Sequence, residues 1–197
     1  MSALMDLLQS SLKGSSLGNI SQKLGQDEQT TSHAINAALP MLIGALSRST
    51  KSDGGAGLAR ALEKKHDGTV LNDLSAHVAQ DDEQDGRGIL KHVLGGNRDA
   101  AAQVLGMSSG IGSDKAESLM ATLAPVVLGA LGKARAENKL GGQDLTRLLD
   151  KESESLHRRT PSMMNAVWGL LDADGDGDTD MSDLLKRGSS GLTRLLR

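Results

Sequence analysis

Two stretches of sequence decide the fold, AINAALPMLIGAL at residues 34–46 and LMATLAPVVLGAL at residues 119–131. Apolar residues cover every face of the first stretch and the second repeats the pattern, which indicates helices that are buried on all sides. Pro40 should kink its helix, Pro125 stands at the matching place, and Gly44 allows a close neighbour. Each run is shorter than the ~20 residues that a membrane-spanning helix requires, so we expect no transmembrane segment.

The similarity between the two stretches extends into their flanks. Upstream, residues 24–25 correspond to residues 105–106, and downstream, residues 57–63 correspond to residues 144–150 at the Leu, Arg and acidic positions. We interpret this pattern as an internal duplication. Two all-apolar helices must bury each other or share one core, so the simplest architecture has two central helices covered by amphipathic ones.

Helical spacing dominates the rest of the chain. A long helix is expected from an N-cap at Asp27 to Arg48, after a short helix that Gly25 closes. The segments that should cover the central helices span residues 4–12, 17–24, 70–78, 88–94, 98–105 and 143–156. The connections, rich in Gly, Ser or Asp, are expected at residues 49–56, 80–87, 106–112 and 158–162. No convincing strand run is present, and the sequence predicts an all-α multihelical bundle.

A C-terminal unit should follow this bundle. We expect a multihelical domain at residues 1–157 and an EF-hand-like helix-loop-helix at residues 158–197. The glycine-rich stretch before the second central helix is neither a P-loop nor a dinucleotide fingerprint, because no strand precedes it. Instead, Ser113 or Asp114 is expected to cap the next helix, with Glu117 completing a capping box on Asp114.

Composition excludes several functional classes. Of 197 residues, 38% are hydrophobic, but Phe and Tyr are absent and Trp168 is the single aromatic residue. The core must therefore be aliphatic, and nucleic-acid binding through base stacking is disfavoured. The net charge of -3 gives no overall attraction to phosphate backbones, and the absence of cysteine excludes disulfides and thiolate chemistry. The N-terminus shows no signal peptide, so we expect a cytoplasmic protein.

Several motifs resemble a bacterial family of unknown function, the YidB-like family. They are LLQSSL at residues 7–12, AALPMLIGAL at residues 37–46, HDGTVLNDL at residues 66–74 and ILKHVLGG at residues 89–96. The resemblance covers residues 1–149. It implies a multihelical fold around two buried central helices, and it implies no established activity.

One motif carries specific chemistry, the stretch DADGDGDTDMSD at residues 172–183. It fits the twelve-residue EF-hand calcium loop, in which hard oxygen ligands surround the cation and a glycine at position six allows the sharp turn. Gly177 occupies that position, and Asp178 supplies its backbone carbonyl at position seven. The side chains at positions one, three, five, nine and twelve are Asp172, Asp174, Asp176, Asp180 and Asp183. The sequence therefore predicts one bound calcium ion.

The flanks of this loop agree with an EF-hand, and the loop resembles the dockerin type, which also ends in Asp. Three departures lower the expected affinity: Asp183 is shorter than the usual Glu, Thr179 replaces an aliphatic residue, and the glycines from Gly188 onward break the exit helix early. The alternative interpretation is an acidic, solvated turn. Six aspartates so close together repel one another strongly without a cation, which favours the metal site.

Other chemical signals are weak. The five histidines show no zinc spacing, and no nucleophile elbow surrounds any serine, so we expect no enzyme activity. After Asp183 the chain is basic, with Lys186, Arg187, Arg194 and Arg197 alternating with leucines. This tail could contact anionic lipid or a partner, or pack on its own domain.

The sequence thus supports two main hypotheses. The first is a non-enzymatic calcium-binding helical protein that acts through protein contacts or as a homo-oligomer. The second is a structural or assembly module in which the acidic loop only stiffens the C-terminal tail. An enzyme is a third hypothesis, which acid and base groups converging in a deep pocket would favour.

Overall fold

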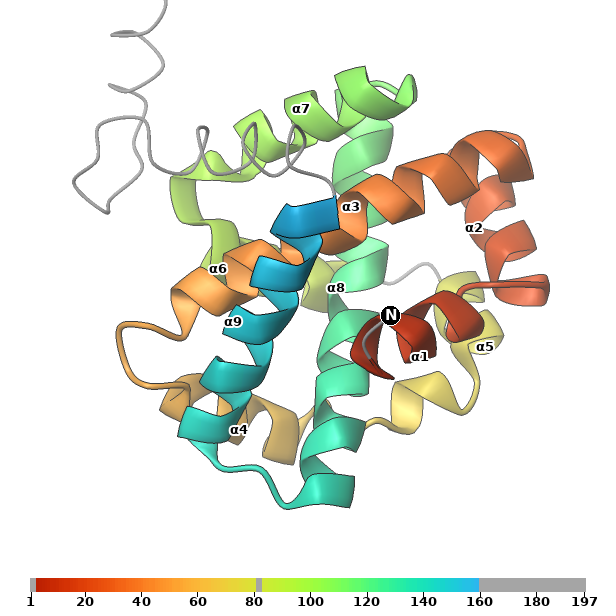
Figure 1. Cartoon of the computed structure of the whole chain (residues 1–197). Coiled ribbons are helices and arrows are strands. Elements are labelled where there is room, and N and C mark those ends of the chain that lie inside the picture. Colours follow the sequence, from red (N-terminus) through yellow and green to blue (C-terminus); the bar gives the residue numbers. More distant parts are fainter. Residues whose placement is uncertain (1–2, 81–82, 160–197) are drawn as a thin grey trace, which may run out of the picture.

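The computed structural model describes residues 3–80 and 83–159, and within these ranges the regular secondary structure is entirely helical (Figure 1). The elements are α1 (Ala3–Ser11), α2 (Ser15–Leu24), α3 (Glu28–Ser49), α4 (Ala56–Lys64), η1 (Thr69–Leu71), α5 (Leu74–Ala79), α6 (Gln84–Leu94), η2 (Gly95–Asn97), α7 (Arg98–Ser109), α8 (Ser113–Asn138) and α9 (Gly142–Arg159). The predicted all-α class is confirmed for this part of the chain. Apart from Arg158 and Arg159 in α9, the expected EF-hand-like unit lies outside it.

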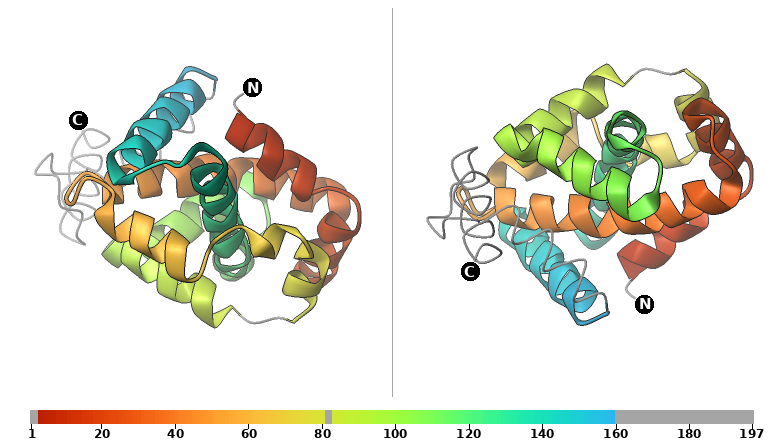
Figure 2. Two further views of the ribbon diagram at one scale, coloured as in Figure 1. Left: turned by 90° about the horizontal axis from the view of Figure 1, so that it is seen from below. Right: turned by 90° about the horizontal axis from the view of Figure 1, so that it is seen from above.

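α3 and α8 are the two central helices. Pro40 lies inside α3 and Pro125 inside α8, and each helix is buried along the apolar stretch around its proline. The two helices contact each other and cross near the middle of the molecule, with the other helices around them (Figure 1, Figure 2). The predicted pair of buried, proline-containing helices in mutual contact is therefore confirmed.

α8 is considerably longer than its all-apolar stretch. It spans 26 residues. By length and composition it is the one helix in the described residues that could cross a membrane, but 78% of its apolar window is buried inside the protein. α8 is thus the core helix around which the other elements pack.

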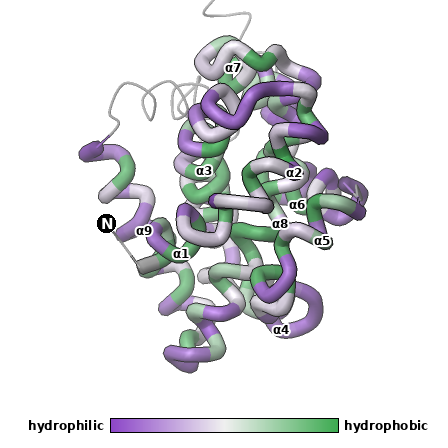
Figure 3. Tube along the Cα trace, turned by 90° about the vertical axis from the view of Figure 1, so that its right-hand side faces the viewer, coloured by the Kyte–Doolittle hydropathy of each residue, from purple (hydrophilic) through white to green (hydrophobic). Residues whose placement is uncertain are grey.

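The core is aliphatic, as the composition requires. The largest fully buried side chains are Leu8, Ile20, Leu39, Ile43, Leu62, Leu90, Leu105, Leu119, Met120, Leu123, Leu131 and Leu145. Figure 3 shows apolar residues concentrated along α3 and α8, whereas hydrophilic residues alternate with apolar ones in outer helices such as α4. Among the described residues, Met107 is the only large apolar side chain left exposed, at 85%. The outer helices therefore cover nearly all of the apolar surface.

The predicted caps at the α2–α3 corner are present. Gly25 ends α2 in the left-handed conformation, with φ of 57°. The Asp27 carboxylate accepts a hydrogen bond of 2.8 Å from the Thr30 backbone N–H, which satisfies a donor that the first helical turn leaves free. These hydrogen bonds hold down the pKa of Asp27.

The start of α8 differs from the prediction. This helix begins after Gly112 with no side chain capping its first turn, and Ser113 is already its first residue. The expectation that Ser113 or Asp114 caps it is therefore wrong. Glu117, assigned to the capping box, instead pairs with Arg87 of α6 at 2.7 Å, so a tertiary ion pair replaces the local one.

Other helix boundaries also differ from the sequence pattern. The helix expected at residues 70–78 is a 3-10 turn followed by α5, because the Asp73 side chain accepts from Ala76 N at 3.0 Å and caps a new helix. The connection expected at residues 80–87 is shorter, since α6 already begins at Gln84. α7 continues through Gly106 to Ser109, and a Cβ on Gly106 would lie 2.5 Å from the Gly112 carbonyl carbon. Gly106 thus permits the close return into α8 rather than ending a helix.

The helix that follows each central helix along the chain packs against the other central helix. α4 follows α3 in sequence but packs on α8, and α9 follows α8 but packs on α3. Polar contacts join the same pairs of helices: Arg135 of α8 pairs with Glu63 of α4 at 3.3 Å. In the other half, Ser47 of α3 donates a 2.6 Å hydrogen bond to Asp150 of α9. Glu63 and Asp150 are equivalent in the alignment of residues 57–63 with residues 144–150.

Two glycines at equivalent places meet where α4 and α9 begin. The same alignment pairs Gly55 with Gly142, and a Cβ on Gly142 would lie 3.0 Å from the Gly55 carbonyl carbon. Equivalent residues contact each other close to a twofold axis. This single contact agrees with the predicted internal duplication, which stays a prediction.

Candidate functional site

The six aspartates predicted to bind calcium lie outside the described residues: Asp172, Asp174, Asp176, Asp178, Asp180 and Asp183. Within residues 3–80 and 83–159, no group of three or more His, Asp or Glu side chains is arranged to hold a metal ion. The candidate site in this part of the chain is a different feature, a pocket that no sequence motif marked.

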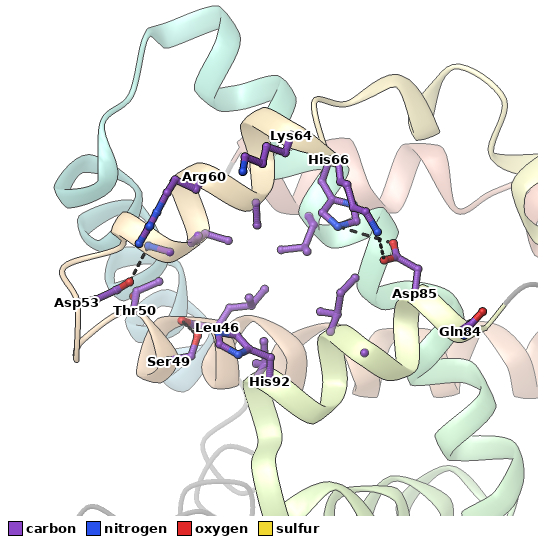
Figure 4. Close-up of a pocket in the computed structure, with 18 residues that line it drawn as sticks. Leu46, Ser49, Thr50, Asp53, Arg60, Lys64, His66, Gln84, Asp85 and His92 are labelled. Carbon is purple, nitrogen blue, oxygen red and sulfur yellow. Dashed lines mark hydrogen bonds and ion pairs between the residues drawn. The ribbon is translucent and has the colours of Figure 1, made fainter.

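A pocket of about 1050 Å³ opens between α4 and α6, and we call it the α4–α6 pocket (Figure 4). The C-terminal end of α3 and Leu128 of α8 complete its walls. Its apolar lining consists of Leu46, Leu58, Ala61, Ile89, Val93 and Leu128. Its ionisable lining consists of Asp53, Arg60, Lys64, Lys65, His66, Asp85 and His92. The pocket therefore combines an aliphatic floor with charged walls.

α4 supplies two of the cations from one face. Arg60 and Lys64 are one helical turn apart, so their side chains project from the same side of the helix, and both line the pocket (Figure 4). The turn before α4 is fixed by Asp53, whose carboxylate accepts from Gly55 N at 3.0 Å and from Gly57 N at 2.6 Å. Gly55 has φ of 78°, a conformation that glycine adopts without strain. This turn sets the position of the α4 wall.

His66 and Asp85 face each other where α4 ends and α6 begins. His66 Nε2 lies 3.7 Å from Asp85 Oδ2, and Lys65 Nζ lies 3.6 Å from Asp85 Oδ1. Burial lowers the pKa of the His66 imidazole below its ordinary value of 6.5, and the Asp85 carboxylate only partly offsets this effect. The imidazole is therefore neutral near pH 7, and Lys65 provides the charge that balances Asp85.

Two glycine contacts hold this facing pair against α8. A Cβ on Gly132 of α8 would overlap the carbonyl oxygen of His66, and a Cβ on Gly86 of α6 would overlap the carbonyl oxygen of Ala121. The backbone next to each ionisable group therefore lies directly on the core helix. Such close packing positions His66 and Asp85 rigidly, as a binding site requires.

The charges of the pocket are not balanced. Three side chains with a full positive charge, Arg60, Lys64 and Lys65, accompany two carboxylates. Asp53 is occupied by two backbone N–H groups, and Asp85 lies against Lys65 and His66. Among residues 3–80 and 83–159, Arg60 donates only to the Ala56 carbonyl oxygen, at 3.2 Å. Within this part of the chain the carboxylates are thus satisfied locally, while the α4 cations remain open to an anionic group.

A second polar cluster, centred on Glu83, has a structural role. Glu83 at the start of α6 accepts a short hydrogen bond from Ser118 of α8 and pairs with Lys23 of α2 at 3.1 Å and with Arg87 at 2.8 Å. Burial by itself raises the pKa of Glu83, but the hydrogen bonds from Ser118 and Lys23 outweigh burial and hold the pKa below 4.5. Glu83 thus joins α2, α6 and α8 as a charged group.

The described part of the chain is thus an all-α multihelical fold. It has an aliphatic core around two crossing helices and a charged pocket beside that core. This chain belongs to a bacterial family of unknown function, "Bacterial protein of unknown function (DUF937)", which matches residues 6–134. The comparison with curated proteins gives no match, and neither does the comparison with solved structures. The predicted membership of a bacterial family of unknown function is confirmed, while the finer YidB-like assignment stays a prediction.

The family match and the pocket coincide. Every residue that lines the α4–α6 pocket lies between Leu46 and Leu128, within the matched region. α9 lies beyond the match, yet it packs on α3 and α4. No single motif marks the pocket, because its ionisable residues come from α4, from the turns on either side of α4, and from α6, which η1 and α5 separate from α4.

Proposed function

We propose that this protein is a non-enzymatic calcium-binding helical protein that acts through contacts with a partner protein or with a second copy of itself. The carrying observation is the loop at residues 172–183, with aspartates at positions one, three, five, nine and twelve and Gly177 at position six. This spacing is the one that an EF-hand uses to surround calcium with oxygen ligands. In this proposal residues 1–157 form the helical body, and residues 158–197 form the calcium-binding unit.

Electrostatics support a bound cation. Six carboxylates within twelve residues repel one another and disfavour a compact loop unless a cation is present. The basic residues after Asp183 give partial compensation. A cation that binds only the folded loop stabilises it by mass action. The closing Asp and the unpaired loop favour a modest affinity, with selectivity over magnesium that is also modest.

The contact surface for a partner is the less specified part of the proposal. In the described residues only Met107 exposes a large apolar side chain. We therefore place the partner-binding role on polar, charged surface and on the calcium-binding unit, rather than on an apolar face of the helical body. Light scattering with and without calcium tests self-association, and an unchanged monomer mass at high protein concentration would contradict that part.

The calcium test uses two matched variants. Asp172→Ala removes a side-chain ligand at position one, whereas Asp178→Ala removes the same charge but keeps the backbone carbonyl that position seven contributes. We expect Asp172→Ala to weaken calcium binding by at least about tenfold, equivalent to ~1.4 kcal/mol, and Asp178→Ala to change it much less. Isothermal titration calorimetry measures both affinities.

Trp168 provides a second readout because it lies four positions before Asp172 and is the only tryptophan. Calcium should change its emission and raise the melting temperature of the full chain. A response of Trp168 without any change in the helical body would favour the structural module over a calcium-regulated one. If millimolar calcium produces no heat, no emission change and no shift in melting temperature, the loop is an acidic turn and the proposal fails.

A further inference from the structure

We propose that the α4–α6 pocket binds a small amphipathic anion, an aliphatic chain that carries one terminal carboxylate. Binding at this pocket is separate from calcium binding at residues 172–183. The proposal rests on three features of the pocket: the chemistry of its floor, the open cations of its α4 wall, and the place of its two carboxylates.

The floor of the pocket suits an aliphatic chain. Leu58, Ile89 and Val93 are only half-buried, and they extend the apolar surface of buried Leu46 and Leu128 towards solvent. A ligand that covers this surface gains the free energy of removing apolar area from water. The described walls contain no aromatic ring on which a base or an aromatic ligand could stack. A flexible alkyl chain fits a leucine, isoleucine and valine surface without needing such a ring.

The α4 wall provides the partner for a negative charge. Arg60 and Lys64 are exposed and lie one turn apart, and toward the described residues Arg60 uses only its Nε, in a hydrogen bond to Ala56. The remaining guanidinium N–H groups form the planar fork that holds a carboxylate with two hydrogen bonds. Lys64 adds a second positive charge to the same wall. Figure 4 shows both side chains on α4, which forms one wall of the cavity.

The two carboxylates of the pocket select for a single negative charge. Asp53 precedes α4, and Asp85 stands at the other end of the cavity beside His66 (Figure 4). A ligand with several charges, such as a nucleotide polyphosphate, would be repelled by these groups. A ligand with one carboxylate can contact the α4 cations and direct its chain along the floor. The volume of about 1050 Å³ accommodates a ligand of this size.

The experiment titrates the full-length protein with decanoate below its micelle concentration, in calcium-free buffer, using calorimetry. Decyltrimethylammonium has the same chain with the opposite charge, and acetate has the charge without the chain. We expect saturable binding of decanoate, and binding at least about tenfold weaker for each of the two control compounds, because decanoate alone satisfies both halves of the pocket. Since no calcium is present, decanoate cannot bind through a calcium ion held at residues 172–183.

Paired variants locate the binding site. Arg60→Gln combined with Lys64→Gln should weaken decanoate binding by about tenfold or more, because both charge-assisted contacts are lost. Lys13→Gln combined with Lys151→Gln removes the same net charge at exposed positions outside the pocket and should leave binding unchanged. Ile89→Ser shortens the floor and should also weaken decanoate binding, while thermal melting verifies that each variant is folded.

Three results would overturn the proposal. The first is no saturable binding of decanoate to the wild-type protein. The second is equal affinity for decanoate in the wild type and in Arg60→Gln/Lys64→Gln, or equal affinity for decanoate and decyltrimethylammonium. The third is a change in oligomeric mass for Arg60→Gln/Lys64→Gln with unchanged decanoate affinity, which would identify the pocket as an interface between copies of the chain.

Discussion

The two halves of the helical body, α2–α4 and α7–α9, share a central-helix pattern but end in helices of different length. α4 has 9 residues, and α9 has 18. α9 therefore runs on along α3, whereas α4 stops at Lys64 and the chain turns away across α8 through His66. The α4–α6 pocket lies on the side of the shorter helix. When two halves share a sequence pattern but one of them ends in a shorter helix, the surface that the shorter helix leaves uncovered can form a pocket.

One pair of positions that the predicted duplication makes equivalent differs between the halves. Ser47 in α3 corresponds to Gly132 in α8 when Pro40 is aligned with Pro125. Ser47 donates a hydrogen bond to Asp150 of α9, so a side chain fills the gap between the two helices. At Gly132 the carbonyl of His66 takes that space instead. The two equivalent positions therefore meet different groups, a side-chain carboxylate at Ser47 and a backbone carbonyl at Gly132.

The largest expected effect comes from filling the space at Gly132. Gly132→Ala places a methyl group on the His66 carbonyl oxygen, so the backbone on one side must move. Overpacking of this kind costs about 3 kcal/mol or more when backbone cannot yield. Chemical denaturation measures the change in the free energy of unfolding. A loss below about 1 kcal/mol would show that the loop at His66 adjusts freely and that Gly132 does not fix the pocket.

The next effect tests the link between the halves at Glu83. Glu83→Gln removes the charge that pairs with Lys23 of α2 while keeping an acceptor for Ser118 of α8. We expect a loss of about 2 kcal/mol near pH 7, since hydrogen bonds to a charged group are lost. Denaturation of both proteins across a pH series provides the measurement.

The difference in unfolding free energy between wild type and Glu83→Gln should depend on pH, in a direction that the pKa of Glu83 sets. The folded-state pKa of Glu83 lies below its ordinary value of 4.5. Its charge therefore stabilises the folded protein fully above that value, and the contribution disappears as the pH falls through the folded-state pKa. The gap between wild type and Glu83→Gln should shrink on acidification. A gap that stays constant down to acid pH would contradict a charged Glu83.

The smallest effect is expected at Ser47. Ser47→Ala removes the hydroxyl that donates to Asp150, and it leaves the packing of α3 against α9 otherwise intact. We expect a loss of about 1 kcal/mol, the usual contribution of one such hydrogen bond. The comparison with Gly132→Ala is the informative one, because both changes end in alanine at equivalent positions. Equal losses would remove the structural distinction between the halves.

Much of the fold could be predicted because helices that are buried on all sides have continuous apolar runs in the sequence. The all-apolar runs around Pro40 and Pro125 identified the two central helices and their contact. Local capping was predictable where the signal was local, as at Gly25 and Asp27. The capping box predicted on Asp114 is absent, because Glu117 pairs instead with Arg87 of α6, 30 residues earlier in the chain. Periodicity carries no information about such tertiary partners.

The pocket was less predictable than the fold. The sequence pattern does not single out Arg60 or Lys64, and His66 is one of five scattered histidines. Their proximity to Asp85 depends on how α4 and α6 both lie against α8. The glycines that permit this approach, Gly86 and Gly132, are visible in the sequence, but their contacts are not. The predicted calcium loop is the reverse case: its proposed ligands lie close together in the sequence, but outside the described residues.

The exchange of end helices also has a consequence for the order of folding. α3 is synthesised early, but α9, which covers one side of it, comes about 100 residues later, as the hydrogen bond between Ser47 and Asp150 shows. Contacts between residues so far apart in sequence slow folding, because a large loop must close before they form. While the chain is still being made, the apolar stretch of α3 therefore lacks part of its cover. We expect a partly folded intermediate at this stage, in which α9 docks last and completes the core.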